Sequence, residues 1–175
     1  MEIQMALEVR ERTQRPMVDK EIFRNAMARL AGAVNVIATS GPAGRTGFTG
    51  TAVCSVSDTP PTLLVCLNQN SRGTPVILAN GVFSVNTLVG TDESLADFFA
   101  GRSGASAEER FQKGDWMTLE TGAPVLRTAV VSFDCRTVQV RRVATHNIFF
   151  ATIEAVHFGE PGPSLIYHDR KYKHI

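Results

Sequence analysis

Two stretches near the C-terminus, 130–143 (VVSFDCRTVQVRRV) and 146–158 (HNIFFATIEAVHF), decide the fold of this chain. Apolar residues alternate with polar ones along much of the first stretch: Val131, Phe133, Cys135, Val138, Val140 and Val143. A period of two is typical of a β-strand. The second stretch is rich in the aromatic and β-branched residues that favour strands. We therefore expect two long strands, the first of them bent.

Shorter segments of the same kind lie on either side of this pair. Strands are predicted at 33–40, 48–56, 62–67, 82–88 and 165–167, with a Gly-rich turn at 41–47. Short helices are predicted at 19–30, 74–80 and 94–99. About seven strands with a few short helices predict a mainly β fold, a single antiparallel barrel. A doubly wound sheet would need more and longer helices, and the chain contains neither Gly-x-Gly-x-x-Gly nor a P-loop motif.

The composition is that of one globular domain. The chain has 175 residues, with 18 Lys and Arg against 17 Asp and Glu, which is long enough to bury a substantial core. We expect an N-terminal arm at 1–18 and the folded domain at 19–175. A net charge of +1 gives no basic excess for nucleic acid, and no apolar run reaches the roughly 20 residues of a membrane span. No secretory signal pattern is present, so the cytoplasm is the expected location.

Cysteine and histidine spacing predicts no metal site. Cys54, Cys66 and Cys135 contain no Cys-x-x-Cys pair and lie in apolar stretches, where buried free thiols are expected. The histidines contain no pair with metal-ligand spacing: His146, His157, His168 and His174. We expect His146, which follows a predicted turn, to be exposed at a cleft. We expect His157 to be a strand residue with a satisfied hydrogen bond.

Two polar segments could bind a ligand. In 46–57 hydroxyl side chains recur on one face of an extended chain, at Thr49, Thr51, Ser55 and Ser57. Small residues lie between them, so a flat polar ring could approach the backbone closely, although a Thr- and Ser-rich edge strand would look the same. The segment 68–74 (NQNSRGT) could hold a phosphate by hydroxyls, helix N–H groups and a guanidinium. It could equally be a structural Asx-rich turn.

The order of these segments resembles the flavin reductase-like family, whose members fold as a split β-barrel, an antiparallel Greek-key barrel that binds FMN or FAD. The motifs that carry the resemblance spread from Phe23 to Tyr172: AGAVNVIAT (31–39), GTAVCSVSDTPP (50–61), FSVNTL (83–88), FFAG (98–101), PVL (124–126), HNIFF (146–150) and PSLIY (163–167). Two positions depart from the family pattern. Ala144-Thr145 replaces the Gly-Asp that often precedes the histidine, and Arg170 replaces a glycine between the two tyrosines.

The resemblance implies roles for individual residues. Those beside the isoalloxazine ring and ribityl chain would be Thr49, Thr51, Ala52, Cys54, Ser55 and Val56. Those near the ribityl and phosphate groups would be Asn68, Asn70, Ser71 and Arg72. Those closing over the site from the helical loop would be Phe99, Gly101 and Arg102. His146, the one candidate catalytic residue, would face the nicotinamide with Tyr167 and Tyr172 nearby.

The implied activity is hydride transfer from NADH or NADPH to FMN or FAD by a homodimer, with the flavin supplying the chemistry. Electrons would pass to a partner monooxygenase. Three alternatives remain open at this point. The first is a reductase that retains FMN and reduces the cobalt of a corrin in cobalamin biosynthesis. The others are a non-catalytic flavin- or haem-binding barrel and an oxidase related to pyridoxine phosphate oxidases.

Overall fold

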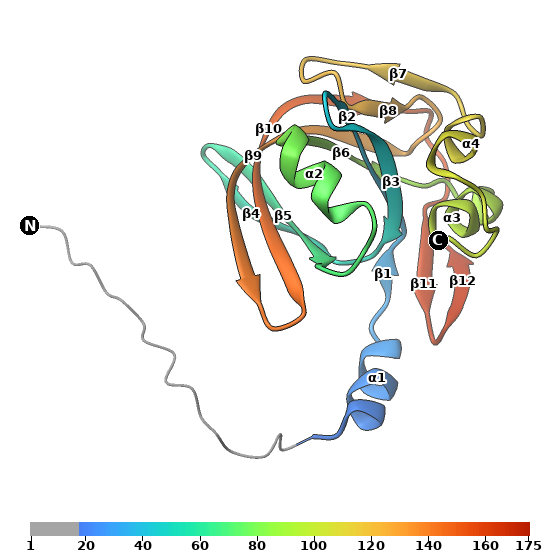
Figure 1. Cartoon of the computed structure of the whole chain (residues 1–175). Helices are drawn as coiled ribbons and strands as arrows, with labels where there is room; N and C mark the ends of the chain where they lie inside the picture. The colour runs from blue at the N-terminus through green and yellow to red at the C-terminus, as the bar shows by residue number, and fades with distance from the viewer. Residues whose placement is uncertain (1–17) are drawn as a thin grey trace, which may run out of the picture.

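The computed structural model describes residues 18–175, so the predicted N-terminal arm lies, apart from Val18, outside the described residues. Four short helices decorate three sheets (Figure 1). The helices are α1 (Lys20–Ala28), α2 (Thr74–Asn80), α3 (Glu93–Phe99) and α4 (Ala107–Phe111). The large sheet contains, in spatial order, β3 (Gly44–Gly50), β2 (Asn35–Gly41), β6 (Val82–Thr87), β9 (Val131–Val143), β10 (His146–Phe158), β5 (Pro61–Asn68) and β4 (Val53–Asp58). The small sheets contain β1 (Gly32–Ala33) with β11 (Leu165–His168) and β12 (Lys171–His174), and β7 (Trp116–Thr118) with β8 (Pro124–Leu126).

The β9–β10 hairpin lies at the centre of the large sheet, as the alternating pattern predicts. Its strands pair antiparallel from His146 opposite Val143 to Phe158 opposite Val131, and two register shifts interrupt the ladder. Such bulges bend a strand and increase its twist. The two predicted long strands, the first of them bent, are therefore confirmed, and their curvature helps the sheet to curl into a split barrel.

The barrel is split between β3 and β4. These strands are the two edges of the large sheet, yet only Thr51 and Ala52 separate them in the sequence. Because two residues connect opposite edges, the sheet must curl until the edges approach each other at that point. The prediction of one continuous strand over 48–56 was therefore wrong: the chain leaves one edge and enters the other. The predicted turn at 41–47 was also too long, because β3 already begins at Gly44.

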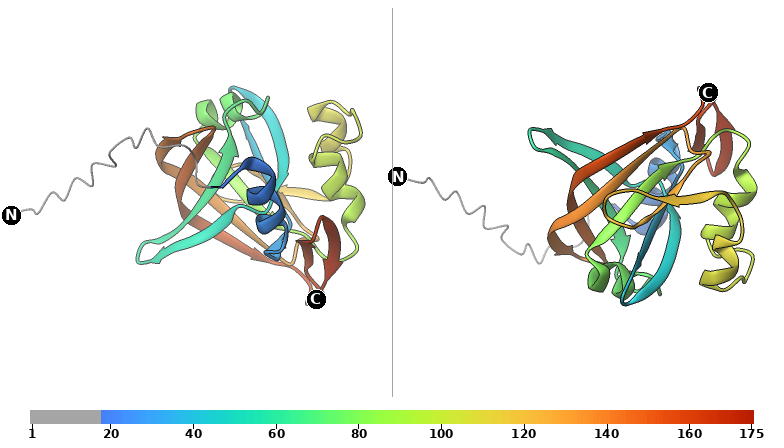
Figure 2. Two further views of the ribbon diagram at one scale, coloured as in Figure 1. Left: turned by 90° about the horizontal axis from the view of Figure 1, so that it is seen from below. Right: turned by 90° about the horizontal axis from the view of Figure 1, so that it is seen from above.

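Two hydrophobic cores lie on opposite faces of β2. Val36 and Ala38 pack into a cluster with α3 and α4, whereas Ile37 packs into the barrel interior with α2. Successive side chains of a strand point to opposite faces, so β2 is buried on both sides and reads as an apolar run. Figure 2 shows α3 and α4 together on one flank of the strands, away from α2.

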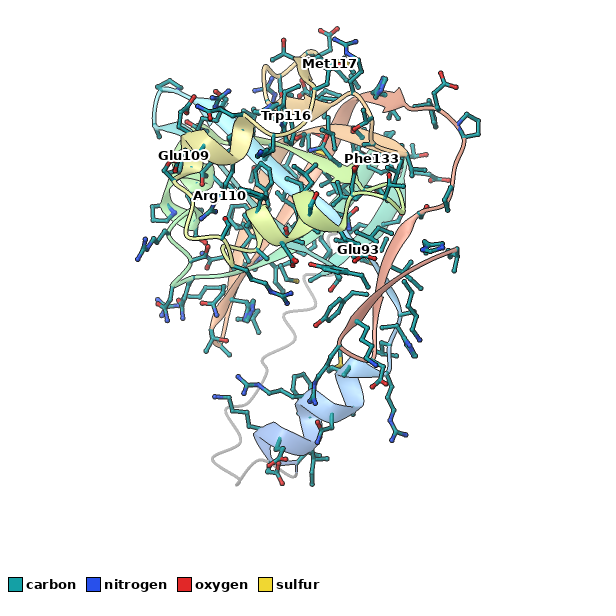
Figure 3. The ribbon with its side chains drawn as sticks, turned by 90° about the vertical axis from the view of Figure 1, so that its right-hand side faces the viewer. Glu93, Glu109, Arg110, Trp116, Met117 and Phe133 are labelled. Carbon is teal, nitrogen blue, oxygen red and sulfur yellow. The ribbon has the colours of Figure 1, made fainter. Side chains whose placement is uncertain are left out.

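An aromatic cluster holds the α3–α4 flank together. The Phe99 ring centroid lies 5.2 Å from that of Phe111 and 5.6 Å from that of Trp116. Edge-to-face and tilted arrangements of this kind are favourable for aromatic pairs. Figure 3 shows Trp116 beside α4 and above α3. The sequence analysis missed three short strands: β7, which begins at Trp116, its partner β8, and the C-terminal β12. Each has too few residues to show the alternation of apolar and polar side chains that identifies a strand.

Helix α1 extends away from the barrel. Asp19 caps it by accepting hydrogen bonds from the N–H groups of Glu21 and Ile22, both at 2.8 Å, as N-cap residues do. The helix ends at Ala28, two residues before the predicted end, and buries none of its side chains. It touches the β11–β12 turn, where Arg170 donates a hydrogen bond to Asn25 Oδ1 and the Asp169 N–H donates one of 2.6 Å to the Ala28 carbonyl, and otherwise it projects away from the sheets (Figure 3).

Two further expectations concern the thiols and the membrane. Cys135 is buried and Cys66 half-buried, but Cys54 is exposed, so the prediction of three buried thiols was wrong for Cys54. Cys54 lies on β4, an edge strand, and apolar neighbours in the sequence do not bury an edge strand on both faces. Within residues 18–175 no helix is long and apolar enough to span a membrane.

Candidate functional site

A pocket of about 230 Å³ opens where β3 ends, beside the loop after α3 and the β11–β12 hairpin. We call it the tyrosine pocket. Its lining residues come from segments far apart in the sequence: Val34, Thr49, Gly50, Thr51, Ala100, Arg102, Tyr167 and Tyr172. Five of these are predicted site residues: Thr49, Thr51, Arg102, Tyr167 and Tyr172. The fold therefore brings predicted site residues from Thr49 to Tyr172 together in one pocket, although they lie far apart in the sequence.

The aromatic wall of the tyrosine pocket is a pair of cross-strand tyrosines. Tyr167 on β11 lies opposite Tyr172 on β12, with ring centroids 5.5 Å apart in an edge-to-face arrangement. Tyr172 donates a hydrogen bond of 3.1 Å from its hydroxyl to Asp97 Oδ1. Burial first, and then this hydrogen bond, raises the pKa of Tyr172 to about 12. The phenol therefore stays protonated and remains a hydrogen-bond donor at neutral pH.

Arg102 provides the positive charge of the pocket. The residue lies in an exposed loop in which Gly101 and Gly104 have positive φ angles of 77° and 71°, a conformation that glycine adopts without strain. Arg102 Nη1 lies 2.9 Å from Asp97 Oδ1, and the arginine side chain keeps 60% of its surface exposed. An exposed guanidinium next to a pocket can form paired hydrogen bonds to a phosphate.

Thr49 and Phe99 connect the pocket to the flank helices. Thr49 Oγ1 donates a 2.6 Å hydrogen bond to the carbonyl of Ala96 in α3, which fixes the end of β3 against that helix. Phe99 is 1% exposed and belongs to the core cluster. A β-carbon added at Gly47 would lie 2.8 Å from the Phe99 ring, so the glycine permits this close approach. Phe99 thus lies in the core that supports the pocket, rather than closing over the site as the resemblance implied.

The other residues expected beside the flavin ring lie along the split. Cys54, Ser55 and Val56 on β4 are exposed, as is Ala52 just before the strand. Because β4 is an edge, alternate backbone N–H and C=O groups face away from β5 without a strand partner. The register between β4 and β5 shifts between Ser55 and Ser57. The break after β3 and this shift mean that the hydroxyls from 49 to 57 do not form one continuous strand face.

The amide-rich segment forms a tight loop at the end of β5. Asn68 Oδ1 accepts a 2.9 Å hydrogen bond from the Asn70 N–H, and the Asn68 carbonyl accepts bonds from the Ser71 N–H at 3.0 Å and the Thr74 hydroxyl at 2.8 Å. This is the Asx turn that the sequence allowed. We call residues 68–73 the amide loop; Arg72 forms no ion pair within residues 18–175 and is exposed.

His146 lies next to the amide loop. It is the first residue of β10 and pairs across the sheet with Asn68. Its Nδ1 lies 2.9 Å from Thr145 Oγ1, and the residue is exposed, as expected. The Gln69 N–H donates a 3.0 Å bond to the Thr145 carbonyl, which attaches the loop to the β9–β10 turn. His157, by contrast, has its Nε2 2.9 Å from the Arg127 carbonyl, which confirms its predicted satisfied hydrogen bond.

The tyrosine pocket and the amide loop lie against opposite faces of β3. A β-carbon built on Gly73 would lie 3.1 Å from Thr46 Oγ1, whereas one built on the next strand residue, Gly47, would touch Phe99. Consecutive residues of a strand face opposite sides. Figure 1 shows α2, which follows the amide loop, on one side of β3 and α3 on the other. The exposed edge between them, with β4, offers backbone groups to a ligand that reaches both regions.

Comparison with known proteins shows the family to which this fold and site belong. A family model described as "Flavin reductase like domain" matches residues 27–175. The chain belongs to the flavin reductase family. This confirms the resemblance, which ran from Phe23 to Tyr172, and the mainly β split-barrel fold that it implied.

Individual flavin reductases are similar over nearly their whole length. A protein of Serratia proteamaculans named "FMN reductase (NADH) RutF" is 51% identical over 159 residues, which cover 91% of this chain and 90% of that protein. One of the same name from Agrobacterium fabrum is 47% identical and covers 99% of this chain and 96% of its own length. Among solved structures, a flavin reductase from Haemophilus somnus 129pt is 44% identical with a TM-score of 0.86, covering 90% of this chain and all of its own.

The sequence analysis missed Asp97, the acceptor that joins Arg102 to Tyr172. In the sequence Asp97 is one of several carboxylates on short helices, and its spacing to Arg102 matches no motif. Only the return of the C-terminal hairpin to α3 gives this aspartate two partners. The same analysis also missed the other three lining residues, Val34, Gly50 and Ala100, whose side chains carry no polar group to mark them.

Proposed function

We propose that this flavin reductase transfers hydride from NADH to FMN. The observation that carries the proposal is the tyrosine pocket, in which an exposed arginine, two hydroxyls and an aromatic pair converge beside a free sheet edge. Relatives about half identical over nearly the whole chain are named FMN reductase (NADH), which supports the choice of donor and flavin.

The donor set suits FMN. A flavin has a flat polar ring, a hydroxylated chain and a phosphate. The unpaired edge groups of β4 suit the ring, and the hydroxyls of Thr49 and Thr51 suit the polar chain. Arg72 in the amide loop and Arg102 in the tyrosine pocket are the exposed cations that could bind phosphate. When bound, the flavin supplies the hydride-accepting chemistry.

The protein's own contribution is positioning. Tyr167 and Tyr172 provide aromatic surface on which a nicotinamide or flavin ring can pack and from which water is excluded. His146, exposed next to the amide loop, would orient the nicotinamide. Holding two rings in contact replaces a bimolecular encounter with an arranged one, so positioning, rather than a general acid, would supply most of the rate enhancement.

We infer that the domain, residues 19–175, forms a homodimer. The apolar face of α1 is unpartnered within the described chain, with Ile22 58%, Phe23 57% and Met27 47% exposed. An amphipathic helix of this kind is stable when its apolar stripe is buried, and a second copy would supply that surface. Sedimentation analysis should give a dimer, and Ile22→Asp with Phe23→Asp should give a monomer.

The proposal extends to what happens after the reaction. Reduced flavin would leave the site for an oxygen-using partner enzyme. In support, one similar solved structure, 25% identical with a TM-score of 0.83, is the flavin reductase component of a bacterial two-component tryptophan halogenase. Three free thiols and no disulfide among the three cysteines are compatible with the reducing cytoplasm. We propose that location.

The deciding experiment measures NADH oxidation while FMN is varied from below one equivalent to large excess. A rate that keeps rising with free FMN supports flavin as a released substrate. Saturation at one FMN per subunit would instead indicate retained FMN, and acceptors such as cobalt corrins would then be tested. No oxidation of NADH or NADPH with either FMN or FAD would refute the reductase proposal and favour a binding module.

A further inference from the structure

Asp97 connects three of the segments that form the tyrosine pocket. It lies in the last turn of α3, and its Oδ1 accepts hydrogen bonds from Arg102 Nη1 at 2.9 Å and from the Tyr172 hydroxyl at 3.1 Å. Its backbone carbonyl also accepts a bond of 3.3 Å from the Arg102 N–H. One carboxylate therefore holds the helix, the loop and strand β12 in a single arrangement, although Asp97 does not line the pocket itself.

Stability does not account for this arrangement. The side chains of Arg102 and Asp97 are 60% and 45% exposed, and exposed ion pairs contribute little to the free energy of unfolding. The chain offers a comparison: Arg127 and Asp115 form an ion pair of 3.1 Å with 55% and 60% exposure. Neither of those residues lines the pocket. The two pairs are alike in exposure, so a difference between them in ligand binding would reflect the place of Asp97 beside the pocket and its bond to Tyr172.

Arg102 is the residue that needs such an anchor. It follows Gly101 in a loop whose residues 100–104 are exposed, and a long flexible side chain loses conformational entropy when it is held for a ligand. A carboxylate already bonded to the guanidinium removes part of that loss before the ligand arrives. The second donor, Tyr172, comes from strand β12 and restricts where the carboxylate can lie.

We propose that Asp97 is a positioning residue that holds Arg102 and Tyr172 together beside the tyrosine pocket, so that the guanidinium is placed to bind a phosphate of the incoming nucleotide. The proposal rests on the proposed function in one respect: the phosphate is that of FMN or of the nicotinamide dinucleotide. Both nucleotides would present a phosphate to the same guanidinium, so separate measurements of FMN binding and of NADH kinetics distinguish them.

The test compares Asp97→Ala, Asp97→Asn and Asp97→Glu with Asp115→Ala as the matched control. For each protein the Kd of FMN is measured by fluorescence quenching, and KM and kcat for NADH by steady-state kinetics. We expect Asp97→Ala to raise either the Kd or the KM about tenfold, the scale of one charge-assisted hydrogen bond, with kcat within about twofold. The constant that changes identifies the nucleotide. Asp97→Glu should restore part of the loss, and Asp115→Ala should change neither constant.

A spectroscopic readout reports the network itself. The chain has two tyrosines, so in a Tyr167→Phe background the ultraviolet titration of tyrosinate follows Tyr172 alone. Besides Asp97, the groups that face this phenol are Arg102 and Tyr167. Removing the Asp97 carboxylate should lower the Tyr172 pKa from about 12, because the phenolate would lose a negative neighbour and the phenol its acceptor.

Each outcome decides the proposal. Unchanged Kd and KM in Asp97→Ala overturn it, whether or not the tyrosine pKa moves. If the alanine variant does not fold, Asp97→Asn carries the test, because it keeps the size and an acceptor oxygen but loses the charge that holds Arg102. If the unmodified protein does not oxidise NADH, the proposed function fails, and the FMN Kd alone then supports or refutes the role of Asp97.

Discussion

The tyrosine pocket and the amide loop present similar chemistry, an arginine with hydroxyl or amide neighbours, but they are built differently. The amide loop is closed mainly by short-range bonds, such as that from the Asn70 N–H to Asn68 Oδ1, and one long-range bond from the Gln69 N–H to the Thr145 carbonyl attaches it to the β9–β10 turn. The tyrosine pocket is held by long-range ones, such as that from Tyr172 to Asp97, 75 residues apart. One region is therefore encoded locally, and the other depends on the whole fold.

This difference predicts where each region is sensitive. A pocket assembled from distant segments depends on the core beneath those segments, so a buried substitution can disrupt it. A loop closed by its own backbone keeps its shape when surface side chains change, and only its ligand contacts are lost. The substitutions below test this contrast, beginning with the largest expected effect.

Phe99→Ala should have the largest effect because it removes a fully buried ring from the core next to the tyrosine pocket. We expect the free energy of unfolding to fall by about 3–5 kcal/mol, measured by urea denaturation. Phe158→Ala, whose ring is 78% exposed, is the control and should cost less than about 0.5 kcal/mol. A loss below about 1 kcal/mol for Phe99→Ala would show that the pocket does not depend on this core.

His146→Ala tests the residue next to the amide loop. We expect KM for NADH to rise about tenfold, equivalent to roughly 1.4 kcal/mol, while the Kd of FMN stays within about twofold. The histidine is exposed and has one side-chain contact, so folding should be unaffected. His157→Ala, on the same strand, is the control for kinetics. Equal losses in donor use and FMN affinity would refute the assigned role.

Arg72→Ala tests whether the amide loop binds the flavin phosphate. We expect the Kd of FMN to rise about fivefold, since one exposed charge-assisted contact is lost. Riboflavin lacks the phosphate, so its Kd should be the same for both proteins. A parallel loss for riboflavin would mean that the loop had changed shape, contrary to the local encoding described above.

Glu154→Gln should have the smallest effect, because its ion pair lies on the β9–β10 hairpin, outside both regions. Arg136 donates to this carboxylate at 2.6 Å and 3.1 Å, and these hydrogen bonds lower the pKa of Glu154. A carboxylate with a lowered folded-state pKa stabilises the fold above its unfolded pKa and loses that contribution as the pH falls through the folded pKa. The Tm of the unmodified protein should exceed that of the variant slightly at about pH 7.

Repeating the Tm measurement at about pH 3, below the ordinary carboxylate range, provides the check. The contribution of the ion pair shrinks as the pH falls from the unfolded pKa through the lowered folded-state pKa of Glu154, so the two melting temperatures should approach each other. A Tm difference that stays constant or grows at low pH would contradict the assigned cause. Catalytic constants should be unchanged throughout, which makes this variant a baseline for the other three.

Several elements were predictable from the sequence because their signals are local. The alternation along residues 131–143 identified β9, and Asp19 identified the start of α1. The amide-rich segment indicated a loop before a helix, and this is where α2 begins at Thr74. Signals of this kind depend on residues within one or two turns of each other, which interact in the same way whatever surrounds them.

Other features could not be predicted in this way. Residues 48–56 look like one strand, because nothing in the local pattern shows that Gly50 and Val53 lie on opposite edges of a sheet. Phe99 looks like a residue that could cover a ligand, because an aromatic side chain at the end of a helix has the same local pattern whether it is buried or exposed. Burial on one face or the other is set by which elements pack there.

The sequence by itself determined the type of most elements, the amide loop, and the resemblance that the comparisons confirmed. The tertiary structure alone decided that the barrel splits at Thr51 and Ala52, that Cys54 is exposed, and that Asp97 joins Arg102 to Tyr172. The physical reason is how far apart in the sequence the interacting residues lie. Periodicity, capping and turn formation arise from neighbours along the chain, whereas a pocket arises where sheet curvature and the returning C-terminal hairpin bring distant side chains within hydrogen-bonding distance.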